Sequence, residues 1–131
     1  AISNLNPLNK KKQIHINDLD NENLISLEPT GIFQTSIKKR LQDYNIEPVF
    51  KIQTTSMLQS AQMVENNIGT AIIDPFIGHM IKNRKVIIKK LTPQIYFDYA
   101  YIWPEGRELS ALAEEFITEL KKIANAVTKI N

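Results

Sequence analysis

Short apolar segments alternate with segments of helical periodicity along residues 24–81, and this alternation is the feature that most constrains the fold. Residues 24–27, 48–53 and 70–73 have the apolar or alternating pattern of strands. After each of them, apolar residues recur every three or four positions, which is the spacing of one helix face. A succession of such strand–helix units favours a parallel sheet with right-handed crossovers. The sequence therefore predicts an α/β sandwich.

Proline and glycine mark the limits of the predicted helices. A first helix over residues 32–44 follows Pro29 and Gly31, and a second over residues 57–68 ends at Gly69. A short third helix begins at Pro75, because proline suits the first turn of a helix. Beyond it, residues 86–91 and 95–103 are predicted as strands, and residues 108–129 as the last helix.

The last predicted helix carries a continuous apolar stripe. Its members recur at steps of three or four residues: Leu109, Leu112, Phe116, Leu120, Ile123, Val127 and Ile130. Burial of a Leu, Ile or Phe side chain contributes about 1.5–3 kcal/mol. We therefore expect the stripe to be covered, either because the helix folds back or because the chain self-associates.

Length and composition narrow the classes of function. The 131 residues suit one domain, and 16 Lys and Arg against 14 Asp and Glu exclude polyanion binding through bulk charge. The absence of cysteine excludes a disulfide scaffold, thiol catalysis and a thiolate zinc site. No apolar run approaches the roughly 18 residues of a membrane span, and the first residues lack a secretory apolar region. We expect a cytoplasmic domain that binds no membrane and needs no cofactor.

Candidate binding residues follow the predicted strands. In an open parallel sheet, ligands bind beyond the carboxyl ends of the strands, where the next helices begin. The residues at these places are Thr30, Gly31, Thr54, Thr55, Ser56, Asp74 and Phe76. Backbone N–H groups at helix starts favour a small anion such as a carboxylate, and the hydroxyl groups add donors. The alternative is plain helix capping, a common role of Ser, Thr and Asp.

No pattern points to a metal site or to a nucleophile with its base. Asp74 is a catalytic carboxylate, a ligand contact or a helix cap. His15 and His79 lack a second ligand at metal-site spacing, and the glycine-rich nucleotide motifs and G-x-S-x-G are absent. The lysine-rich stretches alternate with acidic ones, so we interpret them as solvated faces rather than a nucleic-acid site.

Three passages, in order along the chain, resemble the LysR-type transcriptional regulators. They are residues 6–27 with NPL, IHINDL and LISL, residues 53–75 with QTTS and MVENNIGTAIIDP, and residues 101–110 (YIWPEGRELS) followed by Phe116. The resemblance implies a periplasmic-binding-protein-like (type 2) three-layer sandwich with a mostly parallel sheet and flanking helices. It also implies that about 14–91 form the second lobe of the effector-binding domain, and about 92–131 the return strand and helix of the first lobe. The family's DNA-binding winged helix-turn-helix is absent from the sequence.

The same resemblance implies a function without catalysis. The domain would sense a small molecule, an amino acid or another carboxylate, and control DNA binding through the missing N-terminal domain. Thr30, Gly31, Thr54 and Ser56 would contact this effector, with Asp74 and Phe76 nearer the hinge between the lobes. A homodimer or tetramer would form through the helix 32–44 and the strand 48–53. The residues of this interface are Ile32, Phe33, Lys39, Arg40, Phe50 and Ile52.

The sequence departs from the family pattern at one point and leaves two other functions open. Asn66 and Asn67 stand where the family usually has a small residue and a glycine, which argues against a tight backbone approach there. One alternative function is part of a two-lobed periplasmic solute-binding protein. The other is an α/β enzyme that uses Asp74.

Overall fold

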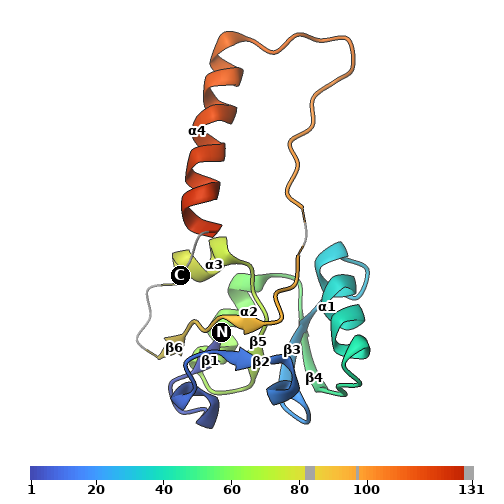
Figure 1. The fold of residues 1–131 in the computed structure, drawn as a ribbon, viewed down its shortest axis with the longest axis vertical. Coiled ribbons are helices and arrows are strands. Elements are labelled where there is room, and N and C mark those ends of the chain that lie inside the picture. Colours follow the sequence, from blue (N-terminus) through green and yellow to red (C-terminus); the bar gives the residue numbers. More distant parts are fainter. Residues whose placement is uncertain (82–84, 97, 129–131) are drawn as a thin grey trace. The chain divides into compact units, whose positions relative to one another are not determined.

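The computed structural model describes residues 1–81, 85–96 and 98–128 (Figure 1). The chain divides into two compact units, Ala1–Phe97 and Asp98–Asn131. The first unit contains the sheets with helices α1 to α3, and the second contains the last helix, α4.

The centre of the first unit is a parallel sheet of three strands in the order β4-β3-β5. The strands are β3 (Asn23–Leu27), β4 (Val49–Thr54) and β5 (Thr70–Ala71). Beyond β5 the chain start lies beside the sheet, and Ala71 N donates to Ala1 O at 3.0 Å. Strand β1 (Ile2–Ser3) then pairs antiparallel with β6 (Val86–Ile87). The predicted parallel sheet is thus confirmed, and β1 with β6 forms a separate antiparallel pair beside it.

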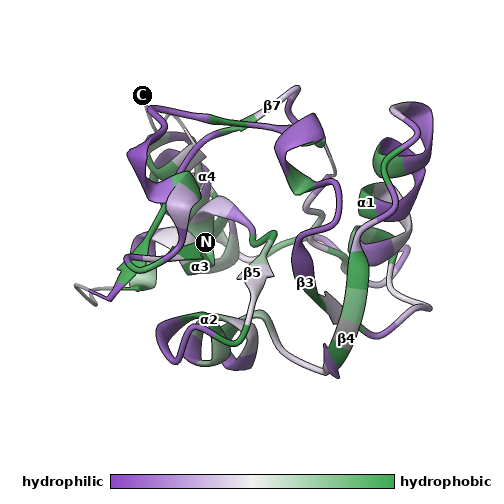
Figure 2. Cartoon of the chain, turned by 90° about the horizontal axis from the view of Figure 1, so that it is seen from below, coloured by the Kyte–Doolittle hydropathy of each residue, from purple (hydrophilic) through white to green (hydrophobic). Residues whose placement is uncertain are grey.

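The two faces of the sheet are covered by different helices (Figure 2). Successive side chains of a strand point to opposite faces. Leu24 belongs to a buried cluster with two residues of α1 (Ile32–Asp43), Ile37 and Leu41. Its neighbour Ile25 belongs to a second buried cluster, with Val64 of α2 (Met57–Glu65). One helix on each face of the sheet makes the predicted three-layer sandwich.

Helix α2 is shorter than predicted and ends before Gly69. Asn66 is its C-terminal cap, and Asn67 follows with a φ of 56°. Glycine most often occupies this left-handed position after a helix, and asparagine is one of the few other residues that tolerate it. Asn67 therefore ends the helix at the place where the family usually has glycine.

Several short elements complete the first unit, and the apolar pattern did not predict most of them. They are the 3-10 helices η1 (Pro7–Lys10) and η2 (Ile16–Leu19), the strands β2 (Ile14–His15) and β7 (Leu91–Thr92), and the predicted α3 (Pro75–Met80). The single strand predicted over residues 86–91 is wrong. Its ends pair with different partners, β6 with β1 and β7 with β2, so the chain leaves the first pairing before it enters the second.

The second unit consists of an extended segment and α4 (Ala111–Thr128). The strand predicted over residues 95–103 is wrong, because its described residues pair with no other described segment and a strand needs such a partner. Within the unit, the rings of Tyr101 and Trp103 stack with centroids 5.8 Å apart. No described residue of α4 is buried. Phe97, Lys129 and Ile130 lie outside the described residues.

Candidate functional site

The turns that carry the candidate residues leave one edge of the sheet. Leu27 and Thr54 are register partners at the carboxyl ends of β3 and β4. The turns that follow these two strands therefore begin side by side. The turn after β5 is tied to the same edge, because Asp74 N donates to the sulfur of Met57 in the first turn of α2 at 3.5 Å.

The turn after β3 consists of Glu28, Pro29, Thr30 and Gly31. Gly31 N donates to Glu28 O at 3.3 Å, and proline second with glycine fourth is the residue order of a type I turn. Gly31 is the N-cap of α1 and offers no side-chain cap, so the start of that helix is left without one. Thr30 and Gly31 are exposed.

Gln34 in the first turn of α1 is a residue of this edge that the sequence analysis missed. Its side chain is 2% exposed, and its Oε1 accepts a hydrogen bond from Leu27 N at 3.1 Å. Among the described residues its Nε2 has no partner. The only signal in the sequence was a polar residue beside the apolar face of a predicted helix.

The turn after β4 is held by a pair of buried hydroxyl groups. Thr54 is 6% exposed, and its Oγ1 lies 2.9 Å from Ser60 Oγ and donates to Ser56 O at 3.1 Å. Ser56 Oγ accepts from Leu58 N at 3.2 Å, which caps α2. Ser56 therefore makes the capping contact of the alternative interpretation, whereas Thr54 holds the turn. Thr55 is exposed, and its Oγ1 donates to Gln59 Oε1 at 3.4 Å.

Asp74 also has a capping role. Its Oδ1 accepts a hydrogen bond from Ile77 N at 2.7 Å, and this contact caps α3. Phe76, in the first turn of the same helix, is half-buried.

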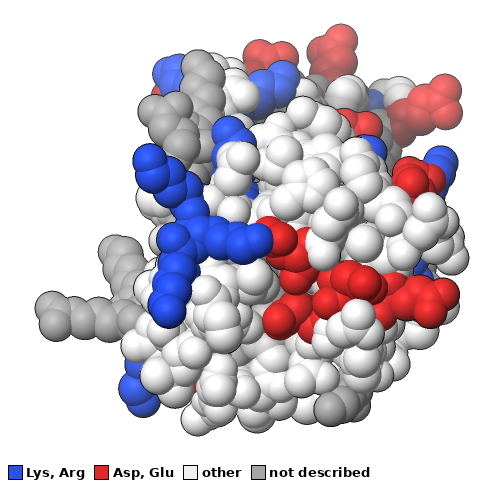
Figure 3. All heavy atoms as spheres, turned by 60° about the horizontal axis from the view of Figure 1, so that its bottom comes forward, with Lys and Arg blue, Asp and Glu red and all other residues white. Residues whose placement is uncertain are grey.

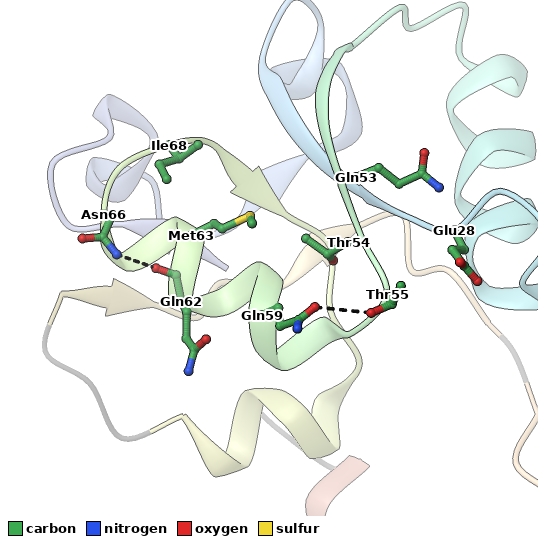
Figure 4. Close-up of a pocket in the computed structure, with 9 residues that line it drawn as sticks. All are labelled: Glu28, Gln53, Thr54, Thr55, Gln59, Gln62, Met63, Asn66 and Ile68. Carbon is green, nitrogen blue, oxygen red and sulfur yellow. Dashed lines mark hydrogen bonds between the residues drawn. The ribbon is translucent and has the colours of Figure 1, made fainter.

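A hollow of about 580 Å³ opens beside the end of β4 and along α2 (Figure 4). Its volume lies in the range of small-molecule sites. The lining residues are Glu28, Gln53, Thr54, Thr55, Gln59, Gln62, Met63, Asn66 and Ile68. Of the sequence-predicted candidates, the hollow brings together Thr54 and Thr55, whereas the other five are not in its lining.

Carboxamides dominate the polar lining, and the sequence analysis missed them. Gln59, Gln62 and Asn66 follow one another on α2 and its cap at steps of three and four residues, so they share one helix face. Gln53 adds a fourth amide from β4. This spacing was visible in the sequence, although only the fold places the face beside the end of β4.

His15 and Asp18, which lie outside this edge, have structural roles. His15 Nδ1 accepts from Asn17 N at 3.2 Å, and Asp18 Oδ2 accepts from His15 N at 2.9 Å. Lys11 pairs with Asp18 and lowers the pKa of that carboxyl. Figure 3 shows acidic and basic groups gathered in adjacent areas of one face. No group of three metal-ligating side chains occurs within residues 1–81, 85–96 and 98–128.

The expected interface residues lie on α1 and on β4, which is an edge strand. Ile32, Lys39 and Phe50 are exposed, and Arg40 is half-buried. Phe33 and Ile52 also pack against the two core clusters.

Comparison with known proteins identifies the family. The protein-family model of the LysR substrate binding domain matches residues 1–124 of this chain. The chain belongs to this family. Regulatory protein NocR of Agrobacterium tumefaciens (strain T37) is 25% identical over 109 residues, which are 83% of this chain and 36% of NocR. Transcriptional activator protein LysR of Escherichia coli is 23% identical over 115 residues, which are 88% of this chain and 37% of that protein.

Solved structures confirm the fold of this LysR substrate-binding domain. The regulatory domain of Synechocystis PCC6803 CcmR, in complex with 2-PG, has a TM-score of 0.71 at 17% identity and covers 98% of this chain and 61% of its own. HinK, a LysR family transcriptional regulator from Pseudomonas aeruginosa, has a TM-score of 0.70 at 14% identity. The match covers 93% of this chain and 43% of the HinK chain. The fold is thus the predicted type 2 periplasmic-binding-protein-like sandwich.

The family assignment bears on the functions that the sequence left open. The LysR family consists of transcription regulators rather than enzymes. The chain spans a little over a third of the length of the two regulators compared above. No described helix is long and apolar enough to cross a membrane.

Proposed function

We propose that this chain is the effector-binding and oligomerisation part of a cytoplasmic LysR-type regulator. It senses a small organic molecule, carboxylate-bearing and similar to an amino acid, and it controls DNA binding by an N-terminal winged helix-turn-helix. Residues of about 14–91 form the second lobe, and about 92–131 return to the first. The observation that carries the proposal is the hollow beside the carboxyl end of β4, on a fold that belongs to this family.

The polar groups at this edge support a ligand of that kind. The start of α1 has no side-chain cap, and helix starts attract carboxylates through their N–H groups and the positive end of the dipole. Gln34 Nε2 is a buried donor with no partner among the described residues. Thr55 and the amides of α2 add groups that both donate and accept. In this proposal Thr54 and Ser56 shape the turn, and Thr30, Gly31, Asp74 and Phe76 are secondary contacts.

The oligomer forms through α1 and β4 in this proposal. Strand β4 lies at the edge of the central sheet, with Val49 and Phe50 partly exposed on it. An unpaired strand edge with apolar side chains is a common place of association.

Ligand titration of the full chain tests the proposed function. Amino acids and small carboxylates are added, and amide chemical shifts are followed by NMR. We expect shifts that cluster on the turns after β3 and β4 and along α2, and weaker binding in Thr55→Ala. Thr118→Ala is the matched control, because Thr118 is an exposed threonine on α4. Shifts confined to other surfaces, or equal affinity in both variants, contradict the assigned site.

A further inference from the structure

Glu28 gives the hollow a distinct electrostatic character. The other lining residues are amides, threonines, Met63 and Ile68, so Glu28 is the one ionisable group among them. Within the described residues Glu28 forms no ion pair. A ligand in the hollow therefore meets a negative charge that forms no ion pair with any lysine or arginine side chain that the structure describes.

The backbone holds Glu28 at a defined place. Glu28 directly follows the last residue of strand β3. Its backbone carbonyl oxygen accepts a hydrogen bond from Gly31 N in the turn that precedes α1. Pro29 restricts the backbone of Glu28, the residue that precedes it. In Figure 4 the end of β4 lies between Glu28 and the side chains of α2, and Gln53 of β4 points to the same side of the strand as Glu28. The side chain thus leaves from a fixed point at the rim of the hollow.

From this arrangement we propose that Glu28 is a specificity-determining residue that binds an ammonium or guanidinium group of the effector. A carboxylate accepts charge-assisted hydrogen bonds from such a group, and these are roughly twice as strong as neutral ones. The same charge repels a ligand that carries only a carboxylate. The inference rests on the proposed function and narrows it: the effector is a cationic or zwitterionic molecule, not a simple acid.

Three probes with the same carbon chain separate the two charges. Pentanoate carries a carboxylate alone, norvaline adds one ammonium group, and ornithine adds two. Titration of the full chain by NMR is expected to give the affinity order ornithine, norvaline, pentanoate. In Glu28→Gln the two ammonium-bearing probes bind about tenfold more weakly, whereas pentanoate binds equally well or better. In Glu28→Lys the preference reverses toward pentanoate.

The controls distinguish a change of charge from a change of fold. Glutamine has the shape of glutamate, and the turn uses the backbone of Glu28 rather than its side chain, so Glu28→Gln keeps the thermal stability. Glu47→Gln removes an exposed glutamate outside the hollow and leaves all three affinities unchanged. Equal affinities of pentanoate and norvaline, or an unchanged order in Glu28→Lys, overturn the role of Glu28 and leave the proposed function standing. Binding of none of the three probes at millimolar concentration overturns both.

Discussion

The hydroxyl groups of Thr54 and Ser60 lie 2.9 Å apart in the buried turn between β4 and α2. Thr54 Oγ1 donates to the carbonyl oxygen of Ser56 at 3.1 Å, and Ser60 Oγ lies 3.2 Å from the same oxygen, so one hydroxyl hydrogen remains for the contact between Thr54 and Ser60. The end of the strand and the first turn of the helix are thereby tied together. This link fixes the residue at which α2 begins. It therefore also fixes the position of the amides of α2 that line the hollow.

The Thr54–Ser60 contact predicts a coupled effect on stability. Thr54→Val leaves Ser60 without this partner in the interior, and we expect a loss of about 1–3 kcal/mol in the free energy of unfolding. The double variant Thr54→Val with Ser60→Ala loses less than the sum of the two single variants, because each single variant already removes the contact between the two hydroxyls. Urea unfolding measures all three. Thr55→Val, at an exposed threonine, is the control, and we expect it to change the free energy of unfolding by less than about 0.5 kcal/mol. If the effects of Thr54→Val and Ser60→Ala on this free energy are strictly additive, the proposed link between the two side chains is contradicted.

The close approach of β5 to β3 predicts opposite effects at two glycines. A Cβ on Gly69 would lie 2.6 Å from the carbonyl oxygen of Asn23, so Gly69→Ala forces the backbone apart and costs about 1–3 kcal/mol. At Gly78 the nearest atom would be 3.5 Å away, on Ile88, and alanine favours a helix by roughly 0.5–1 kcal/mol over glycine. We therefore expect thermal unfolding to show a lower Tm for Gly69→Ala and an equal or higher Tm for Gly78→Ala. A harmless Gly69→Ala is incompatible with the described strand spacing.

The Asp18 carboxyl predicts a pH dependence at the N-terminal segment. Lys11 lowers the pKa of Asp18 below its ordinary value of 3.8. A carboxyl whose pKa is lower in the folded state stabilises the fold above its unfolded pKa, and this contribution disappears as the pH falls through the folded pKa. Asp18→Asn is therefore expected to reduce stability at pH 7 and to have little effect near pH 2. Denaturation at both pH values measures this difference in stability. Asp43→Asn, at an exposed residue of α1, is the control. An equal loss of stability in Asp18→Asn at both pH values argues against a titrating contact.

The exposed stripe of α4 predicts self-association. Phe116 is 66% exposed and Leu120 is 45% exposed, although both belong to the apolar face of the helix. Covering such side chains contributes about 1.5–3 kcal/mol each when burial is complete. Light scattering of the full chain is expected to show oligomers that Phe116→Asp shifts toward the monomer. Glu115→Gln, at an exposed polar position, leaves the distribution unchanged. A monomer at all concentrations contradicts this prediction.

Local patterns were sufficient for the central strands and helices. Leu24 and Ile25 are buried on opposite faces, and this was implied by a short apolar run followed by a helix with one apolar face. The order of such units favours parallel pairing, since a helix between two strands brings the chain back to the start of the sheet. The position of Thr54 at a strand end could be predicted for the same reason. Family motifs in the right order added the three-layer architecture.

Long-range partners set the rest, because periodicity contains no information about them. Ile95 and Tyr96 begin an apolar, aromatic segment whose pattern predicts a strand. A strand forms, however, only where the backbone of a second segment pairs with it through hydrogen bonds. The same limit hid the division of residues 86–91 between two sheets. It also hid the role of Glu28, which is an ordinary surface glutamate in the sequence. Folding places it in the lining of the same hollow as amides of α2 that follow it by about thirty residues or more, and only this shared hollow suggests the proposed role for its charge.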